Sequence, residues 1–320
     1  MKPLMITAFL DGSPGHEKQT RGILGALEKL TRIEIQYRKL SAWSSWSLIK
    51  QWAATSLGRP GRLPEPGHSQ SVDLIIGTGS KTHLPMLHLK QKTSTPVVTC
   101  MTPNAIFRSK MDLCLIPQHD RPTPGQNVFC TMGPPNLSRN TGEHDSNRGL
   151  ILIGGRDEKS HTWSTQRVLA QVAGVLDLES TIHWTISSSP RTPLNTILEL
   201  ELLSAKTGRI DFFRAENTPA GWIEQAYEQN RWAWVTADSI SMIYEALSAG
   251  CRVGILPVKW KKKTNKFQDS IDTLIQEGYV TTYDSRQALN RDLPAPAVLD
   301  ESTRCAREIL NRWWPQRLAR

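Results

Sequence analysis

The sequence lacks the features that identify membrane-spanning, zinc-binding and disulfide-stabilised proteins. No apolar run reaches the roughly 18 residues that span a bilayer. The apolar run at residues 5–10 ends at Asp11 and is too short for the core of a signal peptide. The five cysteines contain no C-x-x-C pair, so we expect neither a zinc site nor a disulfide framework, and a reduced, cytoplasmic chain.

Two nucleotide-binding motifs are also missing. The segment GTGSKTH lacks the third glycine of G-x-G-x-x-G, which argues against an NAD enzyme. The chain has no Asp-x-Asp pair, which argues against a metal-bridged nucleotide-sugar site. We therefore expect no bound metal and no cofactor.

The net charge of +9 and the pI near 9.4 predict an anionic partner. Nucleic acid is the weakest candidate, because no helix-turn-helix, RRM or zinc-finger pattern accompanies the charge. An anionic membrane surface and a phosphate-bearing substrate remain.

A tryptophan-rich segment at residues 43–62 bears on the membrane alternative. Large apolar residues near helical spacing lie among basic ones: Trp43, Trp46, Leu48, Ile49 and Trp52 beside Lys39, Lys50, Arg59 and Arg62. Such a stripe is either a core helix or a helix that lies in a membrane interface. In the second case the protein docks on an anionic membrane through this segment.

Alternating strand and helix patterns predict an α/β fold with two parallel sheets. The first half has predicted strands at residues 5–10, 33–37, 72–80, 96–100, 111–117 and 127–131, and a helix at 19–30. The segment 133–149 is rich in Pro, Gly, Asn and Ser and marks a domain boundary. The second half has predicted strands at 150–153, 182–186, 210–213, 232–236 and 253–258, and helices at 163–175, 193–203, 220–229, 241–249, 266–277 and 301–314.

Apolar runs break into glycine-bearing loops and then helical patterns at residues 10–19 and 150–163. Such loops aim backbone N–H groups and the positive helix end at one spot. In the second loop we expect Gly154 and Gly155 at a helix N-terminus, with Lys159 beside them. Arg191 in SPRTP is a second cation suited to phosphate.

The segment VTADSISMIYEAL predicts another helix start. Ser239 or Ser241 is an ordinary N-cap, and this structural role alone would explain them. The functional alternative places Ser239, Ser241 and Met242 near phosphate and Glu245 on ribose hydroxyls, which a carboxylate can accept in pairs.

The segments DGSPGHEKQTRG, VDLIIGTGSKTH, NVFCTMGPPN, SPRTP and VTADSISMIYEALSAG resemble the Elm-type family, named for mitochondrial fission, whose bacterial members are regarded as glycosyltransferases. The resemblance covers about residues 5–280. It implies a GT-B-like fold of two Rossmann-like domains facing across a cleft. Residues 1–140 would bind the acceptor, residues 141–300 the nucleotide sugar, and residues 301–320 form a C-terminal helix.

The resemblance also implies roles for individual residues. The loop from Gly12 to His16 is similar to a glycine-rich loop of such transferases, Glu245 to a ribose ligand, and Gln268 in KFQ to a group near the donor sugar. On the acceptor side the matching positions are Gly15, Ser80 and Asn104.

These features together predict a metal-independent glycosyltransferase at the inner face of the cytoplasmic membrane. It would move a sugar from a nucleotide-diphosphate donor to a membrane-linked glycan. The base that deprotonates the acceptor is Asp11 or His16; we favour Asp11 because it follows a strand at the carboxyl edge of the sheet. The alternatives are a sugar-nucleotide epimerase of the same fold and a non-catalytic, membrane-associated interaction protein.

Overall fold

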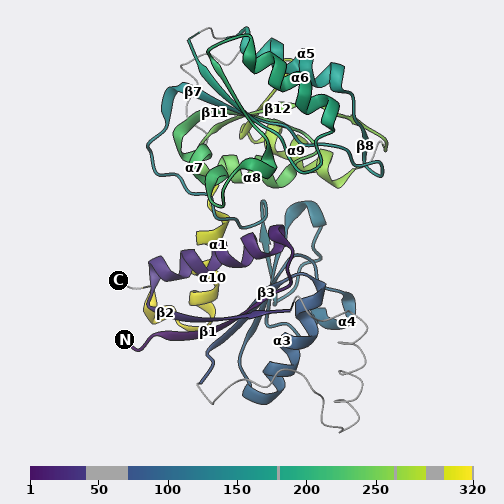
Figure 1. Cartoon of the computed structure of the whole chain (residues 1–320). Coiled ribbons are helices and arrows are strands. Elements are labelled where there is room, and N and C mark those ends of the chain that lie inside the picture. The colour runs from purple at the N-terminus through teal and green to yellow at the C-terminus, as the bar shows by residue number, and fades with distance from the viewer. Residues whose placement is uncertain (41–70, 179–180, 263–264, 286–298, 319–320) are drawn as a thin grey trace. The chain divides into compact units, whose positions relative to one another are not determined.

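The computed structural model describes residues 1–40, 71–178, 181–262, 265–285 and 299–318. The chain divides into two compact units, Met1–Leu137 with Asp300–Arg320 (unit 1) and Ser138–Leu299 (unit 2) (Figure 1). Each unit contains a six-stranded parallel sheet, which confirms the predicted α/β class with two Rossmann-like sheets. The segment at 43–62, predicted to dock on membranes, lies outside the described residues.

Unit 1 alternates strands and helices around a sheet in the order β2-β1-β3-β4-β5-β6. Its elements are β1 (Leu4–Leu10), α1 (Pro14–Leu30), β2 (Ile33–Lys39), β3 (Leu74–Thr78), α3 (Ser80–Thr93), β4 (Val97–Cys100), α4 (Ala105–Arg108), β5 (Leu113–Pro117), β6 (Val128–Thr131) and α10 (Glu301–Trp313). The central strands β3, β4 and β5 are buried along their whole length. This burial is why their sequences read as continuous apolar runs.

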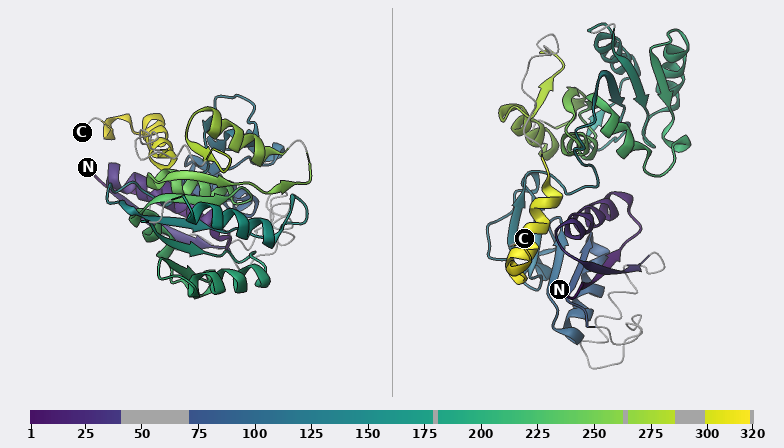
Figure 2. Two further views of the ribbon diagram at one scale, coloured as in Figure 1. Left: turned by 90° about the horizontal axis from the view of Figure 1, so that it is seen from above. Right: turned by 90° about the vertical axis from the view of Figure 1, so that its left-hand side faces the viewer.

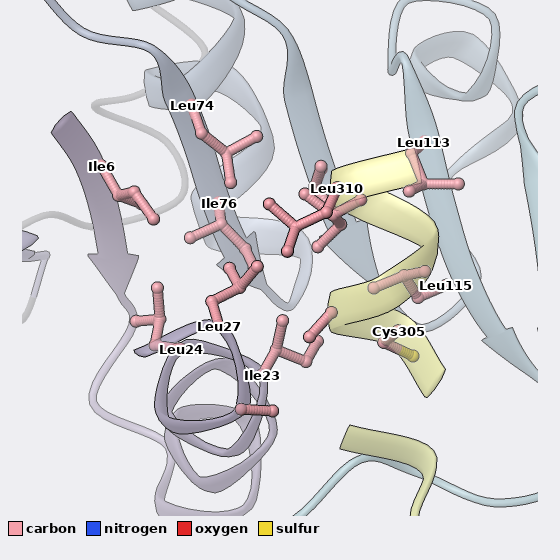
Figure 3. Close-up of a cluster of buried hydrophobic side chains, with 14 of the residues drawn as sticks. Ile6, Ile23, Leu24, Leu27, Leu74, Ile76, Leu113, Leu115, Cys305 and Leu310 are labelled. Atoms are coloured by element: carbon pink, nitrogen blue, oxygen red, sulfur yellow. The ribbon is translucent and has the colours of Figure 1, made fainter. Parts of the chain in front are cut away.

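The two faces of this sheet have separate apolar cores. On one face α1 and α10 lie side by side, in purple and yellow in Figures 1 and 2, and their side chains meet those of the strands. Figure 3 shows Leu27 of α1 and Leu310 of α10 directed toward Ile76 of β3. On the other face α3 contributes Met86, which is fully buried.

Helix α1 begins at Pro14, earlier than the predicted start at residue 19. Proline is favoured in the first turn because its fixed φ suits a helix and it has no N–H to leave unpaired. The residues from Gly15 to Gln19 are exposed or half-buried. They carry no apolar periodicity, so the pattern reveals only the buried part of the helix.

Unit 2 is built around a sheet in the order β10-β9-β7-β11-β12-β14. Its elements are β7 (Asp145–Leu152), β8 (His161–Thr162), α5 (Thr165–Leu176), β9 (His183–Ser187), α6 (Leu194–Ala205), β10 (Ile210–Phe213), α7 (Trp222–Gln229), β11 (Asn230–Thr236), α8 (Ile240–Ala249), β12 (Arg252–Leu256), β13 (Lys259–Trp260), α9 (Lys266–Gln276) and β14 (Val280–Thr282). In Figure 1 helices α5 and α6 cover one face of the sheet, and α7, α8 and α9 cover the other.

Strand β7 begins at Asp145, inside the segment that the sequence predicts as a linker. Only its last four residues are buried, and the first three are exposed. The exposed first residues of β7 are polar, so their composition is that of a loop. The predicted strand at 150–153 therefore captures only the buried end of β7.

Candidate functional site

The first candidate site lies where β1 ends in unit 1. Asp11 follows β1, and its side chain is only 4% exposed. Its Oδ1 accepts a hydrogen bond of 2.9 Å from the backbone N–H of Ser13, and its Oδ2 lies 2.7 Å from Nδ1 of His16. His16 stands in the first turn of α1 with 30% of its side chain exposed.

The hydrogen bond to Asp11 determines which ring nitrogen of His16 can accept a proton. An ionised carboxylate can only accept, so a neutral imidazole donates its Nδ1–H to Asp11 and keeps Nε2 as an acceptor. Both oxygens of Asp11 are engaged within the protein. The two candidate bases thus form one pair, in which the Asp11 side chain is buried and the His16 side chain is the more exposed.

Gly79, which precedes α3, packs directly against this pair. A β-carbon at this position would lie 2.3 Å from Nδ1 of His16 and 2.7 Å from Oδ2 of Asp11. The backbone of Gly79 has φ +92° and ψ 155°, a region that is essentially restricted to glycine. A hydrogen bond of 2.8 Å between the hydroxyls of Thr20 and Thr78 joins α1 to β3 nearby in sequence. The packing of Gly79 against Asp11 and His16 was not predictable from the sequence, where Gly79 is only a glycine next to a helix start.

The three predicted acceptor-side residues are all exposed on loops or helix starts that follow neighbouring strands. Gly15 lies in the first turn of α1 after β1, Ser80 begins α3 after β3, and Asn104 is the N-cap of α4 after β4. These three strands are adjacent and parallel. Their carboxyl ends therefore share one edge of the sheet, which is where parallel α/β sheets bind ligands.

A buried histidine lies in the same helix as Ser80. His83 is 3% exposed, its Nε2 is 3.4 Å from the hydroxyl of Thr99, and its ring packs edge-on against Phe107 at 5.9 Å. Burial lowers the pKa of His83 to about 4, because a charged imidazolium is poorly solvated there. His83 is therefore neutral near pH 7 and serves packing.

The second candidate site lies at the carboxyl edge of the unit 2 sheet, after β7, β9 and β11, which are neighbours. The loop after β7 holds Gly154 and Gly155. The N–H of Gly154 donates to the hydroxyl of Thr236 at 2.8 Å, and that of Gly155 donates to Oδ2 of Asp238 at 3.0 Å. The next helix, α5, begins only at Thr165, after β8.

The expectation of a helix N-terminus at Gly154 and Gly155 is therefore wrong. The amides of both glycines are already paired, with the last residue of β11 and with Asp238 just after it, and α5 begins only at Thr165. The sequence could not show this, because the acceptors stand about eighty residues further along the chain.

Two exposed cations follow strands at this edge. Arg191 follows β9, with 44% of its side chain exposed and its Nη2 2.9 Å from Oδ2 of Asp238. Lys159 is exposed on the loop after β7, where its backbone N–H donates to Oδ1 of Asp157 at 3.0 Å. Both predicted cations thus lie on loops that follow strands of this sheet.

The N-terminus of α8 lies at the same edge, after β11. Ser239 is its N-cap, and its side chain makes no capping bond to the first turn. Ser241 is exposed and Met242 is half-buried. The first amides of a helix have no partner within it, and the helix dipole favours an anion there.

Glu245 lies one turn beyond Ser241 and is 7% exposed. Its Oε2 is 3.5 Å from the hydroxyl of Tyr227, in the neighbouring helix α7. Burial, and next the charge of Glu245, raise the pKa of Tyr227. The carboxylate predicted to bind ribose thus has a partner within the protein and only a small exposed surface.

Gln268 lies in α9 and is held at both ends of its amide. Its Oε1 accepts from Nε1 of Trp260 at 2.5 Å, and its Nε2 donates to Oδ1 of Asp272 at 2.6 Å. Trp260 packs edge-on against His161, whose Nε2 is 2.9 Å from the carbonyl oxygen of Gly155. Gln268 is thereby linked through two aromatic rings to the loop after β7.

Within residues 1–40, 71–178, 181–262, 265–285 and 299–318, no three histidine, cysteine, aspartate or glutamate side chains lie close enough together to hold a metal ion. In this described part of the chain, none of the helices has both the length and the apolar character that a membrane span requires.

The chain matches a known protein family, and its fold is similar to that of several solved structures. A family model described as Mitochondrial fission ELM1 matches residues 14–313. Among curated proteins, no sequence matches the chain. A Listeria monocytogenes structure provisionally assigned as UDP-N-acetylglucosamine 2-epimerase has a TM-score of 0.61 at 11% identity, over 97% of this chain and 95% of that chain.

Two further structures are similar over nearly their whole length. UDP-GlcNAc 2-epimerase from Methanocaldococcus jannaschii has a TM-score of 0.57 at 12% identity, over 96% of this chain and 100% of that chain. The enzyme from Neisseria meningitidis, bound to UDP-GlcNAc, has a TM-score of 0.56 at 10% identity, over 96% and 99%. At such identities the similarity establishes a shared fold.

Proposed function

Because the chain belongs to the mitochondrial fission ELM1 family, whose model covers residues 14–313, we propose that it is a glycosyltransferase acting on a nucleotide-diphosphate sugar. The observation that carries this proposal is the Asp11–His16 pair. A half-exposed imidazole, oriented by a buried carboxylate, is suited to take a proton from a hydroxyl group.

In this reaction Nε2 of His16 takes the proton of the acceptor hydroxyl as its oxygen attacks the anomeric carbon of the donor. The bond from that carbon to the phosphate oxygen breaks, and the nucleoside diphosphate leaves with the bonding electrons. Asp11 keeps the ring in its orientation and stabilises the imidazolium that forms, since its Oδ2 lies 2.7 Å from Nδ1.

The charge on the leaving diphosphate needs compensation, and unit 2 offers it. Arg191 and Lys159 are exposed cations, and the α8 N-terminus adds backbone N–H groups at Ser241 and Met242. Fixed donors of this kind stabilise a developing anion without a metal ion. The fold similarity to enzymes named for UDP-GlcNAc supports a nucleotide sugar as the donor.

The acceptor in this proposal is a membrane-linked glycan, and the protein associates peripherally with the inner face of the cytoplasmic membrane. The net charge of +9 supports an anionic surface as a partner. The docking segment would be residues 43–62. A vesicle-sedimentation assay at rising salt tests this part separately, because attraction to anionic lipids is screened.

The experiment begins with a panel of nucleotide sugars, whose binding raises the melting temperature by mass action. Release of nucleoside diphosphate from the best binder is then measured for wild type and for His16→Ala. We expect His16→Ala to lower turnover by about 10²–10⁴ with donor affinity nearly unchanged.

His183→Ala is the matched control. His183 forms an exposed pair with Asp211 at the same 2.7 Å, and it is the first residue of β9, at the amino end of that strand in unit 2. Wild-type turnover in His16→Ala would remove His16 from the reaction. If no nucleotide sugar raises the melting temperature, the proposal that the donor is a nucleotide sugar is wrong.

The fold similarity to epimerases favours a second candidate, interconversion of a UDP-linked sugar without transfer. The two enzymes differ in product. Transfer releases the nucleoside diphosphate, whereas epimerisation returns a sugar that is still attached to it. A protein that binds the nucleotide sugar but changes it in neither way is the non-catalytic alternative.

A further inference from the structure

Asp238 connects three loops at the carboxyl edge of the unit 2 sheet. Its Oδ2 accepts from the N–H of Gly155 at 3.0 Å, from Nη2 of Arg191 at 2.9 Å and from the hydroxyl of Ser239 at 3.3 Å. These donors follow β7, β9 and β11, three adjacent strands. One carboxylate oxygen therefore sets the relative position of all three loops.

The carboxylate is buried although it is charged. The Asp238 side chain is 1% exposed, and its Oδ1 has no hydrogen-bond partner among the described residues. A buried ion is costly unless a counter-ion and hydrogen bonds compensate it. A group that served only to close the loops could be a neutral amide, so the retained charge points to a role for the cation it holds.

One side of the Arg191 guanidinium contacts Asp238, and much of the side chain is exposed. Nη2 faces the buried carboxylate, while 44% of the side chain remains exposed. A guanidinium carries five N–H donors in a rigid plane, so fixing one of them orients the others. The exposed donors of Arg191 are thereby held at the edge where α8 begins.

The two glycines of this region have their own part in the geometry. A β-carbon on Gly154 would lie 2.2 Å from Oδ2 of Asp238, and one on Gly155 would lie 2.0 Å from the backbone of Arg191. Only glycine permits so close an approach. The glycine loop thus makes room for the Asp238–Arg191 pair, and its amides are already used.

We propose that Asp238 is a positioning residue, which holds Arg191 in the orientation that binds the diphosphate of the donor. This inference rests on the proposed function, because it assigns a place to the diphosphate of that donor. In this proposal Arg191 binds the phosphate groups. Gly154 and Gly155 do not bind them, but leave the space that the Asp238–Arg191 pair occupies.

The test is a double-mutant cycle read by titration calorimetry with two probes, inorganic pyrophosphate and uridine diphosphate. The variants are Asp238→Asn, Arg191→Ala and the two together. Asp238→Asn should weaken both probes by about two- to tenfold, since a freed arginine must be immobilised again on binding. In the Arg191→Ala background the same substitution should leave affinity unchanged.

Asp211→Asn is the matched control, because it also removes one charge and one ion pair from unit 2, at an exposed position. Its affinity should equal that of wild type. An equal effect of Asp238→Asn with and without Arg191, or none in either background, would overturn the positioning role while the proposed function stands. Wild type that binds neither probe would overturn both.

A second variant covers the case in which Asp238→Asn does not fold. Arg191→Lys keeps the charge but loses the planar fork. If orientation matters, Arg191→Lys binds pyrophosphate as weakly as Arg191→Ala. Wild-type affinity in Arg191→Lys would mean that charge alone suffices, and the proposal would fail.

Discussion

Replacing Gly79 by alanine tests whether the Asp11–His16 pair depends on its surroundings. The new β-carbon would lie 2.3 Å from Nδ1 of His16, far inside van der Waals contact. The half-exposed imidazole can yield, whereas Asp11 is buried and bonded to Ser13. We therefore expect the ring to turn outward and the 2.7 Å bond to break.

Two effects of Gly79→Ala lower the free energy of unfolding of unit 1. A non-glycine residue at φ +92° and ψ 155° is strained by about 1–3 kcal/mol. Losing a hydrogen bond to a charged group costs about 1.5–3 kcal/mol more. Gly79→Ala should therefore destabilise unit 1 by about 2.5–6 kcal/mol and reduce turnover nearly as far as His16→Ala does.

Scanning calorimetry measures the first effect and nucleoside diphosphate release the second. Gly12→Ala is the matched control, because Gly12 also has a positive φ, +82°, but a β-carbon there has no atom within 4 Å. It should cost about 1–2 kcal/mol and leave turnover largely intact. Equal loss of turnover in both variants, or a stable and active Gly79→Ala, would refute the reasoning.

Three further predictions concern the donor, the metal and pH. Glu245→Ala should weaken donor binding by about 1–3 kcal/mol if its carboxylate holds a ribose; unchanged affinity in a folded variant would exclude it. Turnover should be the same with and without EDTA, and loss with EDTA that magnesium or manganese restores would contradict the metal-free assignment. Burial lowers the pKa of His83 from 6.5 to about 4, so the unfolded chain binds the proton more tightly. Unit 1 should therefore lose up to about 3 kcal/mol as pH falls from 6.5 toward 4, and urea unfolding of His83→Gln should show a smaller loss.

Much of the fold was predictable because the strands are buried. The runs that end at Leu10, Cys100 and Pro117 are apolar almost throughout, and each matches a strand to within two residues. Where polar residues make up the start of an element, as at Asp145 in β7 or His16 to Gln19 in α1, the pattern predicted the wrong start. Apolar periodicity reports burial, and element ends are commonly exposed.

The site was predictable in its residue types but not in its pairings. From the sequence, Asp11 and His16 were alternative candidates for the base. In the structure they form a hydrogen-bonded pair, because the first turn of α1 brings the His16 ring back to the end of β1. In the sequence, Asp238 is one of several small polar residues at a helix start, and nothing distinguishes it there. Its importance comes from Gly155 and Arg191, which are distant in sequence, and no local pattern reports such contacts.

The return of α10 to unit 1 has a consequence for how the protein is made. Cys305, Ile309 and Leu310 complete the apolar core that α1 begins, yet the ribosome synthesises them after the whole of unit 2. During translation the contiguous unit 2 can close its own core first, while unit 1 keeps an open apolar face until α10 emerges. A nascent chain halted before residue 300 should therefore contain a protease-resistant unit 2 and a unit 1 that recruits chaperones. Emergence of α10 is then the step that commits the amino-terminal half to its native state.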